Sequence, residues 1–263
     1  MKAMKVVILC GGYGTRIRDV ADDIPKPLIP IGDAPILWHI MKYFSLWGLS
    51  EFILCLGYKG SQIKDFFINY QTRMNDFTIT LGEEDKIEYH NKHDEASWKV
   101  TLIDTGIHSL TATRLRMVRD HVKNDDSFML TYGDGVADID IHALINYHNN
   151  HSGALTVSGV RPPGRFGEIE LNATGDVLGF NEKPQATGGV ISGGFFVCRQ
   201  EVFDYLPDNE NVMLEQQPIQ GMTRDGKMKV YAHQGFWQCM DTQRDFNLLN
   251  DLVNTDQAPW MKW

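Results

Sequence analysis

The sequence predicts an α/β fold in three layers, with a mixed, mostly parallel sheet covered by helices on both faces. The apolar run at residues 6–10 ends in two glycines, and such unbroken runs are typical of strands buried on both faces of a sheet. Residues 35–47 place Ile36, Ile40 and Phe44 at helical spacing before the next apolar run begins at 52. Strands that alternate with helices in this way indicate βαβ units and a parallel sheet.

The same two patterns justify the remaining elements in order. After the strand at 6–10, we expect a helix at 35–47, a strand at 52–56, a helix near 63–70, short strands with charged connections from 77 to 104, a strand at 127–131, a helix at 141–149, short strands from 155 to 197 and a last helix carrying Phe246, Leu249 and Val253. Because no linker or repeat separates two halves, we expect one domain over residues 1–263. In open α/β sheets, ligands bind at the carboxyl ends of the strands, which here end near Cys10 and Thr131.

Composition excludes several classes of protein. The 263 residues carry 25 Lys and Arg against 34 Asp and Glu, a net charge of -9, without a block of like charges, which argues against a sequence-independent nucleic-acid binder. No apolar run is long enough to span a membrane and the first residues do not resemble a secretory leader, so we expect a cytoplasmic protein. The cysteines have no CxxC spacing and are expected as reduced thiols, namely Cys10, Cys55, Cys198 and Cys239.

A glycine-rich turn follows the first strand. The run Gly11-Gly12-Tyr13-Gly14-Thr15-Arg16 lets the backbone approach a ligand closely and point its amides at phosphate oxygens. It lacks the Walker pattern, and Ile17 stands where a dinucleotide fingerprint needs glycine or alanine, which argues against a nicotinamide-dependent oxidoreductase. A tight turn without a ligand is the alternative. Arg16 and the lysine of Pro25-Lys26-Pro27 favour a phosphate site, since both are cations and the prolines stiffen the segment.

These residues resemble the signature of the sugar-1-phosphate nucleotidylyltransferases, GGxGTR followed by a lysine in a proline-rich context. Segments along almost the whole chain resemble the cytidylyltransferase branch of that family: Pro35–His39, Cys55–Gly60, Thr131–Val136, Arg165–Gly167, Glu182–Pro184, Gly193–Phe196, Gly235–Trp237, Met240–Thr242 and Ala258–Trp260. The resemblance implies a Rossmann-like fold and an enzyme that converts CTP and α-D-glucose 1-phosphate into CDP-glucose and pyrophosphate for deoxysugar and surface-polysaccharide biosynthesis. It also implies Mg²⁺ as cofactor and a homo-oligomer, which the apolar content of residues 260–263 favours.

The resemblance assigns roles to residues of this chain. Catalytic roles fall to Arg16, Lys26 and Lys183. Nucleotide-binding roles fall to Leu9, Gly11, Gly12, Gly14, Thr15, Arg16, Lys26, Thr105, Gly106, Arg114, Tyr132 and Gly133. The sugar phosphate falls to Glu182, Lys183, Gly193 and Gly194, and the metal to Asp134 and Asp241.

Asp134 is also singled out by its place in the chain. It stands in Tyr132-Gly133-Asp134-Gly135, just past a buried strand, where a carboxylate can hold a cation. Without the resemblance, an Asp beside glycine would be read as a turn residue.

The chain departs from the family pattern near the nucleotide. Ala112-Thr113 replaces an expected Gly-Gly pair, Ile107-His108 replaces a more polar pair, and Ile24 stands where a second lysine is common. Another nucleoside triphosphate or sugar 1-phosphate therefore remains an alternative, as does a non-catalytic module of this fold that binds nucleotide sugars. The expected order of preference is CTP over UTP, and both over dTTP.

Weaker candidates are read as structural. His142, His148 and His151 flank a helix and are expected in solvent. Trp237 and Trp260 are expected in the core or at subunit contacts rather than stacked on a ligand.

Overall fold

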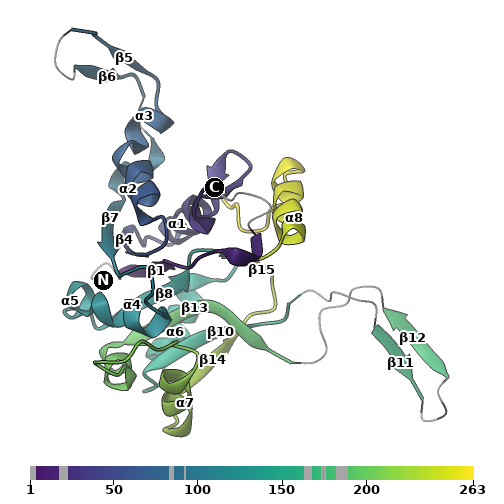
Figure 1. The fold of residues 1–263 in the computed structure, drawn as a ribbon. Coiled ribbons are helices and arrows are strands. Elements are labelled where there is room, and N and C mark those ends of the chain that lie inside the picture. Colours follow the sequence, from purple (N-terminus) through teal and green to yellow (C-terminus); the bar gives the residue numbers. More distant parts are fainter. Residues whose placement is uncertain are drawn as a thin grey trace.

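A central sheet organises the molecule (Figure 1). The computed structural model describes residues 4–17, 23–82, 86–91, 93–162, 168–172, 174, 176–181 and 189–263. Within these residues the sheet has seven strands in the order β14-β10-β13-β8-β1-β4-β7. Its strands are β1 (Val6–Cys10), β4 (Glu51–Leu56), β7 (Lys99–Asp104), β8 (Ser127–Tyr132), β10 (Leu155–Val160), β13 (Ile191–Arg199) and β14 (Met228–Ala232).

Strand direction confirms the predicted mixed, mostly parallel sheet. β13 runs antiparallel to its neighbours β8 and β10, whereas the other neighbouring pairs run parallel. β1 lies between β8 and β4 with every residue buried, as its unbroken apolar run predicted. The carboxyl ends of β1 and β8 therefore open at the same edge of the sheet.

Helices cover both faces of this sheet. They are α1 (Ile36–Leu46), α2 (Gly60–Ile68), α3 (Tyr70–Met74), α4 (Thr111–Met117), α5 (Arg119–Val122), α6 (Ile141–Asn149), α7 (Gln217–Arg224) and α8 (Gln243–Asn254). Val6, Ile8 and Cys10 pack in one hydrophobic core with α1, α6 and α8, whereas Val7 and Leu9 pack in a second core with α4, α5 and α7. Alternation along β1 thus separates two cores and produces the three predicted layers. Among the described residues, no helix has the length and apolar character needed to cross a bilayer.

Short ribbons complete the fold. They are β2 (Pro30–Ile31) with β3 (Ala34–Pro35), β5 (Phe77–Ile79) with β6 (Ile87–Tyr89), β9 (Gly135–Ala137) with β15 (Trp237–Cys239), and β11 (Glu168–Leu171) with β12 (Val177–Asn181). Short 3-10 helices occur at Thr15–Ile17, Lys26–Leu28, Asp94–Ser97 and Gln200–Tyr205. The β5–β6 and β11–β12 hairpins project from the body, whereas β9–β15 lies against it beside α8 (Figure 1).

One stretch is organised differently from the prediction. Residues 77–104 were expected to form only short strands with charged connections, but β7 is a strand of the central sheet and pairs in parallel with β4 along its whole length. Its side chains are half-buried or exposed because β7 lies at the edge of the sheet. An edge strand in which polar and apolar residues alternate has fewer apolar residues than β1. The sequence pattern therefore did not identify β7 as a strand of the central sheet.

The expectation of solvated histidines is wrong for His148. Its side chain is fully buried at the end of α6, and Nδ1 lies 2.7 Å from the Thr156 hydroxyl. Burial, with smaller effects of Arg199 and His151, lowers the pKa of His148 to about 3, so the ring stays neutral at physiological pH. The sequence alone could not show this, because histidine is found both in solvent and in protein interiors.

Candidate active site

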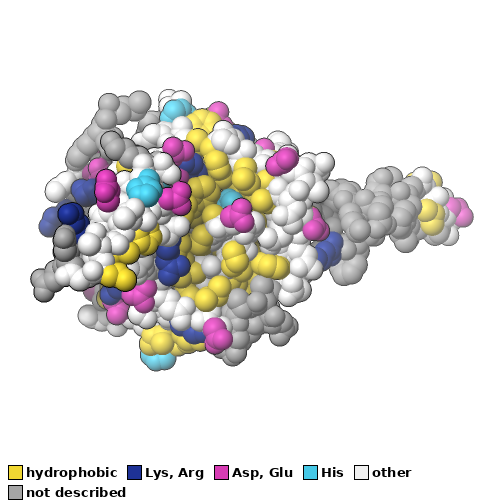
Figure 2. Space-filling model, turned by 90° about the horizontal axis from the view of Figure 1, so that it is seen from above, with side chains coloured by type: hydrophobic (Ala, Val, Ile, Leu, Met, Phe, Trp, Pro, Cys, Tyr) yellow, Lys and Arg dark blue, Asp and Glu magenta, His cyan; other side chains and the backbone are white. Residues whose placement is uncertain are grey.

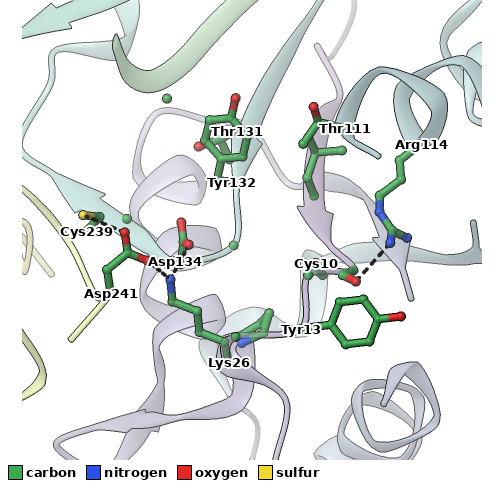
Figure 3. Close-up of a pocket in the computed structure, with 18 of the residues that line it drawn as sticks. Cys10, Tyr13, Lys26, Thr111, Arg114, Thr131, Tyr132, Asp134, Cys239 and Asp241 are labelled. Carbon is green, nitrogen blue, oxygen red and sulfur yellow. Dashed lines mark hydrogen bonds and ion pairs between the residues drawn. The ribbon is translucent and has the colours of Figure 1, made fainter. Parts of the chain in front are cut away.

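A cavity of about 850 Å³ opens at the carboxyl ends of β1 and β8, the place that the sequence predicted for the site (Figure 3). It brings together predicted residues from distant parts of the chain. Those that line it are Leu9, Gly11, Gly12, Gly14, Thr15, Lys26, Arg114, Tyr132, Gly133, Asp134, Gly193, Gly194 and Asp241.

Other predicted residues lie elsewhere. Thr105 and Gly106 do not line the cavity, and the Thr105 hydroxyl donates instead to the backbone carbonyl of Leu56 at 2.6 Å. Glu182, Lys183 and the side chain of Arg16 lie outside the described part of the chain. Their roles stay predictions.

The glycine turn forms one wall of the cavity. At Gly11, an added Cβ would lie 2.1 Å from the Arg114 guanidinium, so a side chain there is excluded by contact. Around Gly12, by contrast, nothing lies within 4 Å of an added Cβ. Gly14 has φ +61°, a left-handed conformation that glycine adopts without strain. The turn therefore exposes backbone at Gly12, where a phosphate could approach it.

Arg114 supports this wall from behind. Its guanidinium is buried and donates from Nη1 to the Leu56 carbonyl at 2.8 Å and to Thr105 Oγ1 at 2.7 Å, and from Nη2 to the Gly11 carbonyl at 3.0 Å. One side chain of α4 thus ties the ends of β4 and β7 to the glycine turn. These contacts occupy much of its donor capacity, although the side chain also borders the cavity.

The charged centre lies beside the glycine turn, where the Lys26 side chain packs near Gly14. Lys26 Nζ lies 2.6 Å from Asp134 Oδ2 and also donates to Asp241 Oδ1 (Figure 3). The register of the β9–β15 ribbon explains how residues so far apart in sequence meet. Cys239 pairs with Gly135, and the Met240 amide donates to the Asp134 carbonyl at 2.8 Å.

The electrostatics of this centre favour full charge on Lys26. Burial alone would lower the pKa of Lys26, but the adjacent carboxylates of Asp134 and Asp241 outweigh it and raise the pKa above its usual value. Burial, and then the charges of Asp241 and Asp134, raise the pKa of Cys239 to about 12. The Cys239 thiol is therefore protonated at physiological pH in this arrangement of charges.

The two carboxylates fit a hard divalent cation. Both already converge on one cationic atom, and about a third of each side chain is exposed. In the described ranges, no group of three or more His, Cys, Asp or Glu side chains is arranged to hold a metal. Two carboxylates that leave positions for substrate phosphates and water suit Mg²⁺.

The far end of the cavity contains Glu215, which the sequence did not single out, and Trp237, which was expected in the core or at a subunit contact and lines the cavity. Glu215 accepts hydrogen bonds from the Tyr132 hydroxyl and, at 2.9 Å, from the Thr111 hydroxyl. Trp237 Nε1 donates to the Gly193 carbonyl at 2.7 Å, and a Cβ on Gly194 would lie 2.7 Å from the Tyr132 ring. Glu215 stands in an exposed loop with no motif around it, so no local signal could have identified it.

The departures from the family pattern divide into two groups. Ala112 and Thr113 are buried and do not line the cavity, and the Thr113 hydroxyl faces the loop at Glu210 and Val212. Ile107 and His108 do line it, and His108 Nδ1 lies 2.9 Å from the Tyr13 hydroxyl. The bulk added at Ala112 and Thr113 therefore does not narrow this cavity.

The position of Asp241 depends on a cap at the start of α8. Thr242 and Asp245 form a reciprocal capping box, and Asp245 Oδ2 also accepts from the Asp241 amide at 3.1 Å. We expect Thr242→Ala to lower the free energy of unfolding by about 1 kcal/mol, measured by urea denaturation. Thr255→Ala at the other end of α8 is the control and should change it by less than about 0.5 kcal/mol. Equal effects of the two variants would contradict the capping role.

Comparison with known proteins agrees with this geometry. A sequence profile of the Nucleotidyl transferase family matches residues 5–246. The glucose-1-phosphate cytidylyltransferase of Salmonella typhimurium is 46% identical over 260 residues, which cover 99% of this chain and 100% of that enzyme. Among solved structures, HddC from Yersinia pseudotuberculosis has the same fold, with a TM-score of 0.69 at 22% identity over 95% of this chain and 99% of that one, and a related structure of it contains GMP-PN. The chain belongs to the nucleotidyl transferase family.

Proposed function

We propose that this protein transfers a cytidylyl group from CTP to α-D-glucose 1-phosphate and releases CDP-glucose and pyrophosphate. The observation that carries the proposal is the convergence of Lys26, Asp134 and Asp241 beside the glycine turn, in a chain nearly half identical to a glucose-1-phosphate cytidylyltransferase along its whole length. A binding module that had lost catalysis would be expected to lack one of these charges. The chain retains all three.

The reaction requires alignment of two anions rather than a covalent enzyme intermediate. An oxygen of the sugar phosphate attacks the α-phosphorus of CTP, a new O–P bond forms, and the bond to the β-phosphate breaks in line with it. The turn from Gly11 to Gly14 presents backbone to the triphosphate, and Lys26 neutralises charge on it. Arg16 assists on the nucleotide and Lys183 holds the sugar phosphate. Glu182 accepts hydrogen bonds from sugar hydroxyls, and Gly193 and Gly194 allow the hexose to approach closely.

The carboxylates of Asp134 and Asp241 form the metal-binding part of the proposed site. Asp134 and Asp241 would hold Mg²⁺, which when bound would supply a Lewis acid and a template for the phosphates. The nucleotide lies along Leu9, Arg114, Tyr132 and Gly133 in this proposal, whereas Thr105 and Gly106 lie outside the cavity lining and are not part of it.

Nucleotide choice gives the first test. We expect CTP to be used faster than UTP, and both faster than dTTP, because buried polar groups that match one base are left unpaired by another. The difference between CTP and UTP is about 10-fold to 10³-fold, depending on how dry these contacts are. A matrix of four nucleoside triphosphates against several sugar 1-phosphates, read by pyrophosphate release with Mg²⁺, measures it.

The matrix separates the alternatives. Fastest turnover with dTTP or ATP would overturn the nucleotide assignment and leave the reaction class intact. No pyrophosphate from any pair would overturn catalysis and favour the nucleotide-sugar-binding module.

A homo-oligomer remains part of the proposal, on different grounds from the sequence. Trp260, which suggested a subunit contact, is fully buried within its own chain against Phe236. Large apolar side chains are instead exposed on α2, α3 and the β5–β6 hairpin, at Ile68, Met74, Phe77, Ile79 and Leu81. In addition to these residues, hydrophobic side chains gather across the middle of the face seen in Figure 2, with charged groups around them. Exposed apolar groups of this extent favour association with another surface.

A further inference from the structure

Lys26 occupies the point at which Asp134 and Asp241 converge. Its ammonium contacts one oxygen of each carboxylate, and its side chain is only 11% exposed. Without this cation the two negative groups would face each other at the edge of the cavity and repel. The lysine therefore compensates the pair when no other cation is there.

The two carboxylates are held by the backbone around them. Asp134 lies at the start of β9, and the β9–β15 register together with the Met240 amide fixes its backbone. Asp241 is held by the donation of its own amide to Asp245 in the cap of α8. Both anions therefore have positions set by elements of the fold.

The backbone of Lys26 is equally fixed, whereas its ammonium is held in place by the two ion pairs. Pro25 and Pro27 restrict the segment, and the Leu28 amide donates to the Pro25 carbonyl at 2.8 Å. The aliphatic part of the Lys26 side chain lies beside Gly14, which has no side chain to cover it, and its ammonium makes the two ion pairs at the lining of the cavity. Four rotatable bonds allow the ammonium to move into that cavity without a change in the backbone.

The oxygens that hold the ammonium are those that a divalent cation would need. Mg²⁺ binds through one or two carboxylates with short metal–oxygen distances. An ammonium in contact with the same oxygens would lie within a few ångströms of the metal, where two positive charges repel. The two cations cannot hold the same pair of oxygens together.

We propose that Lys26 and the divalent cation compete for Asp134 and Asp241, so that arrival of the metal releases the Lys26 ammonium into the cavity toward the triphosphate. The inference rests on the metal role proposed above. Its consequence is a positive coupling between the two ligands. Metal alone must break two ion pairs, whereas metal with a triphosphate offers the released ammonium a new anion.

Binding of Mn²⁺ to the full chain without nucleotide tests the competition, with electron paramagnetic resonance of free Mn²⁺ as the readout. We expect Lys26→Met to bind Mn²⁺ at least tenfold more tightly than wild type. Lys123→Met, which removes a lysine from an exposed pair with Asp120, is the matched control and should bind Mn²⁺ as wild type does. Equal affinity in wild type and Lys26→Met, or no binding in either, would overturn the proposal.

A second measurement uses the wild-type protein and separates release of the lysine from a general effect of charge. We expect the rate at which acetic anhydride acetylates Lys26, followed by peptide mass spectrometry, to rise at least threefold on addition of Mg²⁺, while the rate at Lys123 stays constant. An unchanged or slower rate at Lys26 would show that metal does not displace it. Pyrophosphate release from CTP and glucose 1-phosphate is measured separately, so failure of the competition leaves the proposed function standing.

Discussion

Replacement of Asp241 by Asn lowers turnover of CTP and glucose 1-phosphate by about 10²–10³-fold. The substitution keeps the size of the side chain and removes one of the two negative charges that converge on Lys26. It weakens the site for a divalent cation and leaves Asp134 to compensate the lysine alone. Pyrophosphate release at saturating substrates and Mg²⁺ measures the loss.

Two comparisons make this expectation specific. Asp251→Asn, on the exposed side of α8, removes the same charge away from the cavity and should keep turnover within about twofold of wild type. Asp134→Asn should resemble Asp241→Asn, and the double variant should lose little more, because the two carboxylates act as a unit. Turnover of Asp241→Asn close to that of Asp251→Asn would refute the metal assignment.

Arg114→Met is expected to have the largest effect on stability, a loss of about 3 kcal/mol in the free energy of unfolding. Methionine approximates the length of the stem but donates nothing to the carbonyls of Leu56 and Gly11 or to Thr105. The loss is limited because the Leu56 carbonyl still accepts from the Thr105 amide, and the Gly11 carbonyl from the Tyr58 amide. Urea denaturation measures the change.

The same substitution should act on the nucleotide through the glycine turn. With Gly11 no longer held from behind, we expect KM for CTP to rise about tenfold, while kcat in the molecules that remain folded changes less. Arg119→Met in α5, at an exposed position, is the control for loss of an arginine in this region. A normal free energy of unfolding with a raised KM would instead mean that Arg114 acts on the nucleotide directly.

The parts of the fold that were predicted correctly have strong local signals. The runs that became β1 and β4 are apolar without interruption at 6–10 and 52–56, and β8 is apolar at 128–130, because each of these strands is buried by both layers. The turn from Gly11 to Gly14 was identified from its glycines, of which Gly11 is required by its contact with Arg114 and Gly14 by its left-handed conformation.

The parts that could not be predicted depend on partners that the local sequence does not contain. The direction of the Arg114 guanidinium depends on carbonyls at the ends of two other strands, so the residue type alone could not distinguish a ligand contact from support of the wall. Glu215 reaches the cavity through hydroxyls on β8 and α4. The meeting of Asp134 with Asp241 came only from the resemblance, because strands as short as β9 and β15 carry no readable pairing signal.

The β9–β15 ribbon has a consequence for the order in which the protein matures during synthesis. Lys26 and Asp241 are 215 positions apart, and the buried contact between His39 and Trp260 spans 221 positions. At translation rates of about 5–20 residues per second, Lys26 leaves the ribosome roughly 10–40 s before Asp241. A nascent chain can therefore complete β1, β4 and their helices before Asp241 is available to join Lys26 and Asp134. Catalytic competence therefore has to wait until Asp241 has emerged and paired with Lys26.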